Sequence, residues 1–83
     1  MLNWEKREIG FSAIIENVTL SVAPDRVKNG KPARGTKWRA FISRWDEPSK
    51  SSIRFGRDIY NELQNDVKSA IRFAENVWKE TNQ

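Results

Sequence analysis

The stretch from Lys37 to Trp45 constrains the fold most, because its residues alternate between two chemical types. In an extended strand, successive side chains point to opposite faces. Trp38, Ala40 and Ile42 then share one apolar face. The opposite face is polar or cationic around one aromatic ring and consists of Lys37, Arg39, Phe41 and Ser43. The sequence therefore predicts a strand that buries one face in a core and presents the other for binding.

The chain has 83 residues, which is enough for one domain, residues 1–83, with a thin core. Hydrophobic residues make up 37% and charged residues 31%, as is typical of a soluble globular domain. The sequence has no apolar run long enough to span a membrane and no N-terminal secretion signal. We therefore expect no membrane association. A start at Met1 favours a complete small gene product.

The chain contains neither cysteine nor histidine. Disulfides, thiolate nucleophiles and zinc–cysteine sites are thereby excluded, together with the usual acid–base group at neutral pH. The sequence also carries no Walker-type phosphate loop. These features predict a non-catalytic protein without cofactor or metal, and the lack of cysteine fits a cytoplasmic location.

The positive charge is concentrated in the middle of the chain. Residues 26–57 hold ten basic and two acidic side chains, a net charge of +8, whereas the rest holds five basic and nine acidic, a net charge of −4. Such asymmetry favours an anionic partner at the middle of the chain. The alternative is that a small soluble domain simply carries many lysines and arginines.

Apolar residues also alternate before and after the strand predicted at residues 37–45, and these patterns predict further strands. Residues 11–15 and 18–22 form a hairpin around Glu16 and Asn17, a register that sets Ile15 opposite Val18. A fourth strand is predicted from Ser52 to Gly56. Its side chains divide between the core, which takes Ile53 and Phe55, and the open face, which takes Arg54.

Residues 24–36 are predicted to form a flexible basic loop, because Pro24, Pro32 and two glycines punctuate them. Asn29 and Gly30 are suited to a tight turn. The cations of this loop are Arg26, Lys28, Lys31 and Arg34. The loop either wraps a polyanion or serves as a plain connector.

The clearest predicted element is an amphipathic helix from Leu63 to Lys79, with Asn61 as its N-cap. Its apolar stripe has spacings of three and four and consists of Leu63, Val67, Ala70, Ile71, Ala74, Val77 and Trp78. The predicted fold class is α+β: a single antiparallel three- to four-stranded meander with one C-terminal helix packed on one face. The other sheet face is left for water or a partner.

The open face suits nucleic acid, because lysine and arginine neutralise phosphates and an aromatic ring stacks on an unpaired base. Its predicted contact residues are Lys37, Arg39, Phe41 and Arg54, together with the basic loop. DNA is favoured over RNA. Arginine beside an exposed aromatic side chain is also enriched at protein interfaces, so a host protein is the alternative partner.

The order of these motifs is similar to that of two DNA-binding modules. Trp38-x-Ala40-x-Ile42, a short strand at residues 53–56 and a helix with Ala70 and Ala74 resemble the plant ethylene-response-factor domain and the arm-binding domain of phage-type integrases. The resemblance covers residues 36–78. It implies a sheet packed on a C-terminal helix that reads DNA with its outer face through Arg39, Phe41 and Arg54. The first hairpin departs from these families, since it lacks their arginines.

The size and layout also resemble small phage-encoded proteins, including anti-defence inhibitors. That resemblance implies a protein that blocks a host protein, and the nucleic-acid site of such a host protein is one candidate target. Trp4, Trp45 and Phe73 lie off the regular core stripes and either anchor such a partner or fill the ends of the core. The chain is expected to be a monomer or a homodimer.

Overall fold

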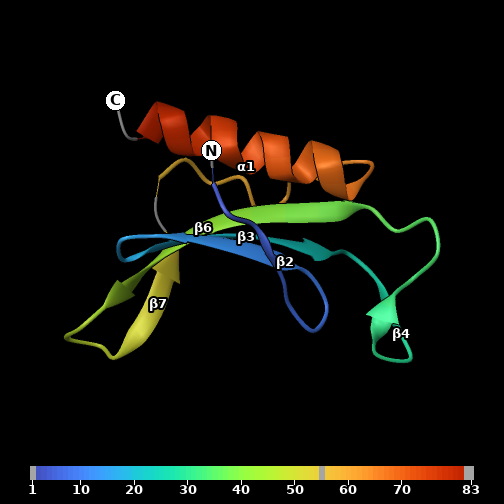
Figure 1. Ribbon diagram of the computed structural model, residues 1–83, viewed down its shortest axis with the longest axis horizontal. Coiled ribbons are helices and arrows are strands. Elements are labelled where there is room, and N and C mark those ends of the chain that lie inside the picture. Colours follow the sequence, from blue (N-terminus) through green and yellow to red (C-terminus); the bar gives the residue numbers. More distant parts are fainter. Residues whose placement is uncertain (1, 55, 82–83) are drawn as a thin grey trace.

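A computed structural model describes residues 2–54 and 56–81, which form an antiparallel sheet with one C-terminal helix across it (Figure 1). The main sheet has the order β1-β2-β3-β6-β7. Its strands are β1 (Glu5–Lys6), β2 (Phe11–Ile15), β3 (Val18–Pro24), β6 (Trp38–Asp46) and β7 (Ser51–Arg54). The helix is α1 (Val67–Thr81), and β4 (Val27–Lys28) pairs with β5 (Lys31–Pro32) in a separate two-stranded sheet. The predicted α+β class, antiparallel sheet and C-terminal helix are confirmed.

The predicted count of three to four strands is wrong, because the main sheet has five strands and a second sheet has two. Glu5 and Lys6 pair with the outer edge of β2 through their backbones, opposite Ser12 and Phe11. Both side chains are exposed, so the pairing leaves no apolar alternation in the sequence. A prediction based on alternating buried and exposed residues cannot detect two-residue strands of this kind.

The predicted register of the first hairpin is confirmed, since Ile15 lies opposite Val18 and the pairing continues to the other end of β2. The turn differs in one detail. Its positive φ, 56°, falls on Glu16 rather than on Asn17. The strand ladder therefore sets the turn geometry, although Asn17 was the residue better suited to it.

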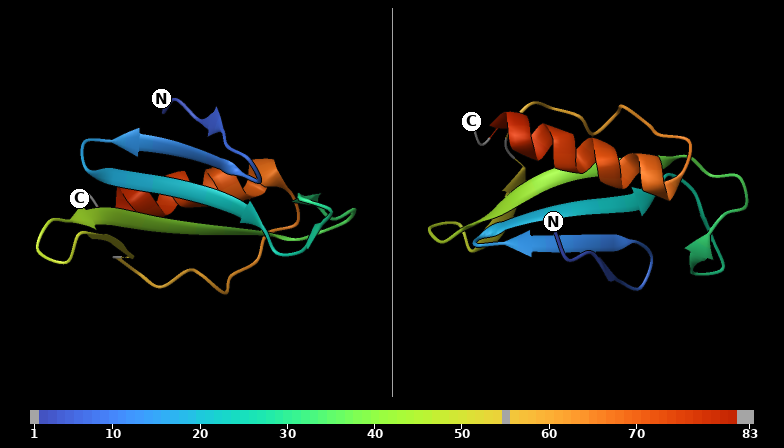
Figure 2. Two further views of the ribbon diagram at one scale, coloured as in Figure 1. Left: turned by 90° about the horizontal axis from the view of Figure 1, so that it is seen from below. Right: turned by 45° about the horizontal axis from the view of Figure 1, so that its top comes forward.

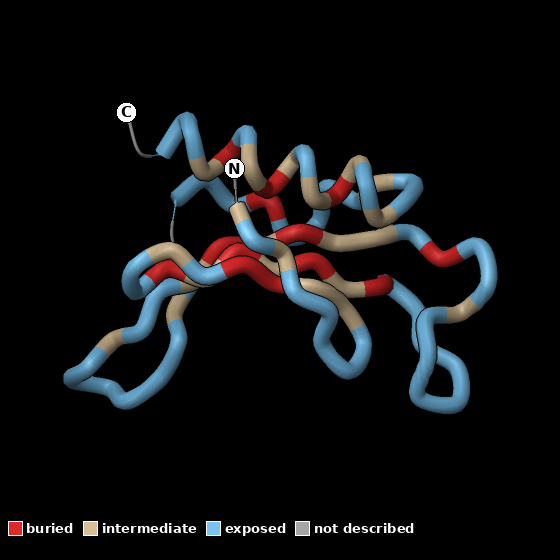
Figure 3. The backbone as a smooth tube through the Cα atoms, viewed as in Figure 1, coloured by how far each residue is buried: buried red, intermediate tan, exposed pale blue. Residues whose placement is uncertain are grey.

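The core lies between α1 and the face of β3 and β6 that turns toward it (Figure 2). Ala70 and Ala74 are fully buried, and their small side chains let the helix lie close to Leu20 and Ala40. In Figure 3 the buried positions follow these two strands and one side of the helix, whereas the projecting turns are exposed. The predicted apolar stripe is thus core from Val67 onward.

The helix begins four residues later than predicted. Asp66 is its N-cap, because its carboxylate accepts a 2.8 Å hydrogen bond from the backbone N–H of Ser69. Gln64, two residues before this N-cap, forms a β-bridge with Trp38 and exchanges two hydrogen bonds with it, of 2.7 and 2.8 Å. Leu63 is exposed instead of buried. The backbone at Gln64, which the periodicity assigned to the first helical turn, is therefore paired with the edge of β6 instead.

Residues 56–66, which we call the connector, lie between β7 and α1 and follow the edge of β6. Among the described residues, β7 pairs with residues 43–46 of that strand, and no described strand pairs with residues 38–42 along the same edge. The connector lies there, burying Ile59 in the core and closing on Trp38. Phe55, predicted to face the core, lies outside the described residues. Among the described helices, none is long and apolar enough to cross a membrane.

Candidate nucleic-acid interface

The strand register gathers a ladder of side chains on the face opposite α1. Ile14, Thr19, Ser43 and Arg54 lie opposite one another across β2, β3, β6 and β7. The next row toward β4 contains Ser12, Ser21 and Phe41. Phe41 and Arg54 therefore share this open face, as the alternation predicted. Most of its remaining side chains are small and hydroxylated.

Tyr60 from the connector reaches the same face and was not among the predicted site residues. Its ring centroid lies 4.4 Å from the guanidinium carbon of Arg39 and 4.3 Å from that of Arg54. The Phe41 ring is tilted against it at 5.9 Å between centroids. Cation–π contacts of this kind hold guanidinium groups over an aromatic ring. The Arg39–Phe41–Arg54 group that the sequence predicted is thus organised around a fourth side chain.

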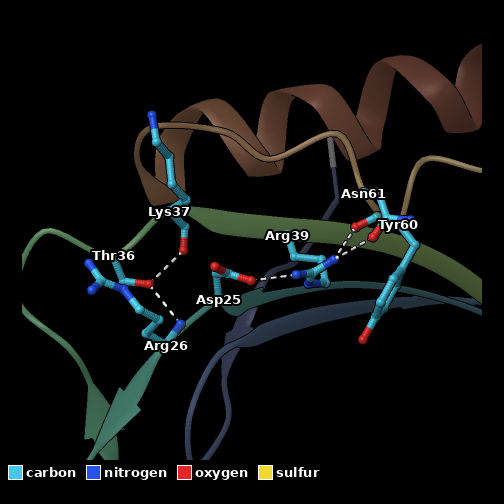
Figure 4. Close-up of polar contacts among 7 residues, drawn as sticks. All are labelled: Asp25, Arg26, Thr36, Lys37, Arg39, Tyr60 and Asn61. Carbon is cyan, nitrogen blue, oxygen red and sulfur yellow. Dashed lines mark hydrogen bonds and ion pairs between the residues drawn. The ribbon is translucent and has the colours of Figure 1, made fainter.

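Arg39 is held by several partners within the protein. Its guanidinium donates to the Tyr60 carbonyl at 2.6 Å and to the Asn61 side-chain oxygen at 3.2 Å, and it forms an ion pair with Asp25 (Figure 4). Only 18% of the side chain is exposed. Arg39 therefore fastens the connector and the end of β3 to the open face. Most of its hydrogen-bonding capacity is used internally.

Lys37 lies apart from this group. Its ammonium donates to the side-chain oxygen of Asn65, just before α1. In Figure 4 its side chain points away from Arg39, toward the helix. The structure therefore does not bring Lys37 together with Arg39, Phe41 and Arg54.

Residues 24–36, predicted to be a basic loop, contain the β4–β5 hairpin, which we call the arm (residues 25–36). The arm projects beyond the end of the sheet (Figure 1). Asn29 and Gly30 form its turn with φ of 54° and 75°, the pair of positive values of a type I′ turn. The predicted tight turn at these two residues is thereby confirmed.

Backbone and hydroxyl contacts fix the base of the arm. The buried Thr36 hydroxyl accepts a 2.9 Å hydrogen bond from the Arg26 N–H and donates one of 2.9 Å to the Lys37 carbonyl. Nearby, the Asp25 N–H donates to the same carbonyl at 2.8 Å, and Ala33 donates to Arg26 at 2.9 Å. The arm thus leaves the sheet through a hydrogen-bonded base.

The cations of the arm are exposed, and they are Arg26, Lys28, Lys31 and Arg34. Within residues 2–54 and 56–81, none of these four side chains takes part in an ion pair or a hydrogen bond. Asp25, the carboxylate nearest in sequence, is engaged by Arg39. The arm therefore concentrates positive charge that the described chain leaves uncompensated.

Acidic groups gather at the other end of the sheet, in the turn between β6 and β7. The Lys50 ammonium, followed by the indole N–H of Trp45, donates to Glu47 and lowers the pKa of that carboxyl. Hydrogen bonds from Ser49 lower the pKa of Asp46. Both carboxylates are therefore ionised at neutral pH. The arm and this turn, in which Lys50 pairs with Glu47, lie at opposite ends of the sheet and are well separated in Figure 1.

The described residues contain no group of three or more acidic, histidine or cysteine side chains arranged to hold a metal ion. A shallow hollow of about 400 Å³ lies on the open face, lined in part by Ser12, Thr19 and Ser21. Beside it, 63% of Ile14 is exposed, and 48% of Trp45 is exposed near the turn between β6 and β7. Trp4 and Phe73 instead pack against the core.

Comparisons of the chain with protein-family models, curated proteins and solved structures found no match. The resemblances to the ethylene-response-factor domain, the integrase arm-binding domain and small phage inhibitors stay predictions.

Proposed function

We propose that this protein is a non-catalytic DNA-binding module whose arm carries the main phosphate contacts. The observation that supports the proposal is a set of four exposed cations that have no ion-pair partner among the described residues, on a hairpin whose base is fixed by hydrogen bonds. Unpaired lysine and arginine side chains bind DNA phosphates and release condensed counterions. A two-stranded β-ribbon also fits the major groove of B-DNA.

The open face extends the proposed contact surface from the base of the arm. Asp25 at that base is joined to Arg39, whose guanidinium lies over Tyr60. Arg54 lies over the same ring and is exposed. In this arrangement Arg54 and Tyr60 contact the nucleic acid, whereas Arg39 positions them. The turn between β6 and β7 adds no comparable cluster of unpaired cations, because its Lys50 pairs with Glu47.

A salt titration with two charge variants, one in the arm and one on α1, tests the proposal. Binding of a labelled 20-base-pair duplex is measured by fluorescence anisotropy over a range of salt concentrations. In the arm variant, Arg26, Lys28, Lys31 and Arg34 are all changed to Gln. The slope of log K against log salt should become shallower by about 0.9 for each phosphate contact removed.

The control variant changes Lys68, Arg72 and Lys79 to Gln on the exposed side of α1. It removes charge at positions remote from the arm and should keep most of the slope. If the slope fell by the same amount per charge removed in both variants, only the net charge of the protein would matter for binding. Absence of duplex and single-stranded DNA binding at low salt would refute the proposal.

A protein-binding inhibitor of the phage anti-defence type is the second candidate function, because Ile14 and Trp45 are exposed large apolar side chains. An exposed apolar group of this kind suits the centre of a protein interface. A host-protein complex should then be lost in Ile14→Asp and kept in the arm variant. DNA binding that is lost in the arm variant and kept in Ile14→Asp would instead favour the DNA-binding module.

A further inference from the structure

A cleft of about 480 Å³ lies between the loop joining β1 to β2 and the arm. Its volume falls within the range of small-molecule sites. Apolar side chains from three parts of the chain line it, and they are Ile9, Phe11, Pro32 and Trp38. The cleft shares no lining residue with the pocket around Tyr60, whereas Ile9 and Phe11 line both the cleft and the shallow hollow on the open face.

The cleft exists because β2 is shorter than its neighbours at this end. β2 begins at Phe11, opposite Val22, whereas β3 and β6 continue to Pro24 and Trp38. The loop before β2 approaches the sheet closely, since a Cβ on Gly10 would lie only 2.2 Å from the Val22 carbonyl oxygen. Phe11 and Trp38 are therefore only half buried. They leave aromatic surface beside the arm.

Charge at the rim of the cleft favours an anionic occupant. Lys6 and Lys31 line it and are exposed, with Glu8 as the acidic residue among the described lining residues. Lys28 lies opposite Lys31 in the arm. An apolar peptide would not need these cations, whereas a nucleotide has both a flat apolar base and a phosphate. The charge thus complements a nucleic acid better than it complements a hydrophobic segment.

We propose that this cleft binds one unpaired base of a single-stranded nucleic acid, with the adjacent phosphates at Lys6 and Lys31. The inference rests on the proposed DNA-binding function and adds a strand preference to it. A base stacked within a duplex does not present its faces to a protein cleft, whereas an unpaired base stacks on aromatic side chains. The protein should therefore bind a single strand, or a duplex with one unpaired nucleotide, more tightly than a fully paired duplex.

Nuclear magnetic resonance locates the contact directly. The protein labelled with ¹⁵N is titrated separately with a ten-residue oligothymidylate and with a blunt duplex. The single strand should shift the indole N–H of Trp38 and the amides of Lys6 and Ile9, and the duplex should shift mainly the arm. The Trp78 indole is the internal control, because that side chain belongs to the helix.

Three substitutions make the assignment quantitative. Ile9→Asp places a carboxylate in the cleft and should weaken oligothymidylate binding about tenfold, consistent with loss of one stacked base. Asn76→Asp adds the same charge on the exposed side of α1 and should have a much smaller effect. Lys6→Gln provides a second cleft variant, since its side chain is exposed and its removal leaves the core unchanged.

The outcomes separate this inference from the proposed function. Single-strand binding without a Trp38 shift, or equal losses in Ile9→Asp and Asn76→Asp, would overturn the cleft assignment while the arm proposal stands. Binding of neither oligonucleotide would overturn both. A preference for blunt duplex over single strand would overturn the strand preference alone.

Discussion

The guanidinium of Arg39 contacts Tyr60 twice, by donating a 2.6 Å hydrogen bond to its main-chain carbonyl and by lying 4.4 Å from the centroid of its ring. One strand side chain thereby fixes both the backbone and the ring of the connector. Because the same guanidinium pairs with Asp25, the connector and the base of the arm share a single anchor. Arg39 thus links the two parts of the proposed interface, which are the arm and the open face around Tyr60.

Arg39→Ala should therefore lower the stability of the fold more than it alters the salt dependence of DNA binding. Hydrogen bonds to a charged group contribute about 1.5–3 kcal/mol each, so a loss of roughly 2 kcal/mol is expected. Urea denaturation measures it, with exposed Arg72→Ala as the control. Unchanged stability with a slope reduced by about one would show that Arg39 instead contacts a phosphate, as the strand alternation predicted.

Ala70→Asp should unfold the domain. Ala70 has no exposed surface and faces the β3–β6 side of the core, so a carboxylate there is buried without a partner. A loss of more than about 3 kcal/mol is expected, which is a large part of the stability of a small domain. Circular dichroism melting provides the measurement. Asn76→Asp should melt close to the wild type, and similar melting of the two variants would refute the helix orientation.

Asp66 should make stability depend on pH in the acid range. Hydrogen bonds from the Ser69 backbone N–H and then its hydroxyl lower the pKa of Asp66 in the folded state. The stabilising contribution is therefore fully present above the unfolded pKa of about 4 and is lost as the pH falls through the lower folded value.

Asp66→Ala should lower the melting temperature at pH 7, and this difference from the wild type should shrink below about pH 4. Asp66→Asn is the matched control, because asparagine caps a helix about as well but does not ionise. Melting curves from pH 2 to 7 check the prediction. A constant difference between wild type and Asp66→Ala across that range would contradict it.

Gly10→Ala should destabilise the hairpin that carries β1. The added Cβ would meet the Val22 carbonyl at 2.2 Å, so the loop must move away from the sheet. Overpacking of this kind costs about 1–3 kcal/mol. Hydrogen exchange at the Arg7 amide, which donates to the Gly10 carbonyl at 2.7 Å, should accelerate, whereas Glu8→Ala, in the same loop and exposed, should leave it unchanged. Unaltered exchange in Gly10→Ala would show that the loop has room to adjust.

The sequence predicts the framework well where a pattern repeats over several residues. The six facing residues of β2 and β3 were predicted in their observed register, because alternation and a two-residue turn leave a single arrangement with one apolar face. The helix stripe predicted which side of α1 is buried. The helix start was misjudged, because Asn61 resembles an N-cap in sequence and only the pairing of Gln64 with Trp38 excludes it.

The candidate site was predicted less completely, because its contacts join residues far apart in the chain. Tyr60 lies 21 residues from Arg39, and no repeating pattern links them. Tyrosine followed by asparagine after a short strand looked like an ordinary connector. The one available signal was that Tyr60 lies close in sequence to Arg54 and Arg57. That signal carries little information until the tertiary structure shows where the connector runs.

The sequence by itself determined the α+β class, the apolar faces of β2, β3 and β6, the buried side of α1 and the concentration of cations in residues 26–57. These follow from local periodicity, which the geometry of the backbone translates directly into faces. Only the tertiary structure decided which cations are engaged internally. Arg39 meets Asp25, 14 residues away, and Lys37 meets Asn65, 28 residues away, whereas the arm projects beyond the sheet and its cations find no such partner in the described chain. Charge pairing depends on which distant segments meet, and that is set by packing and strand order.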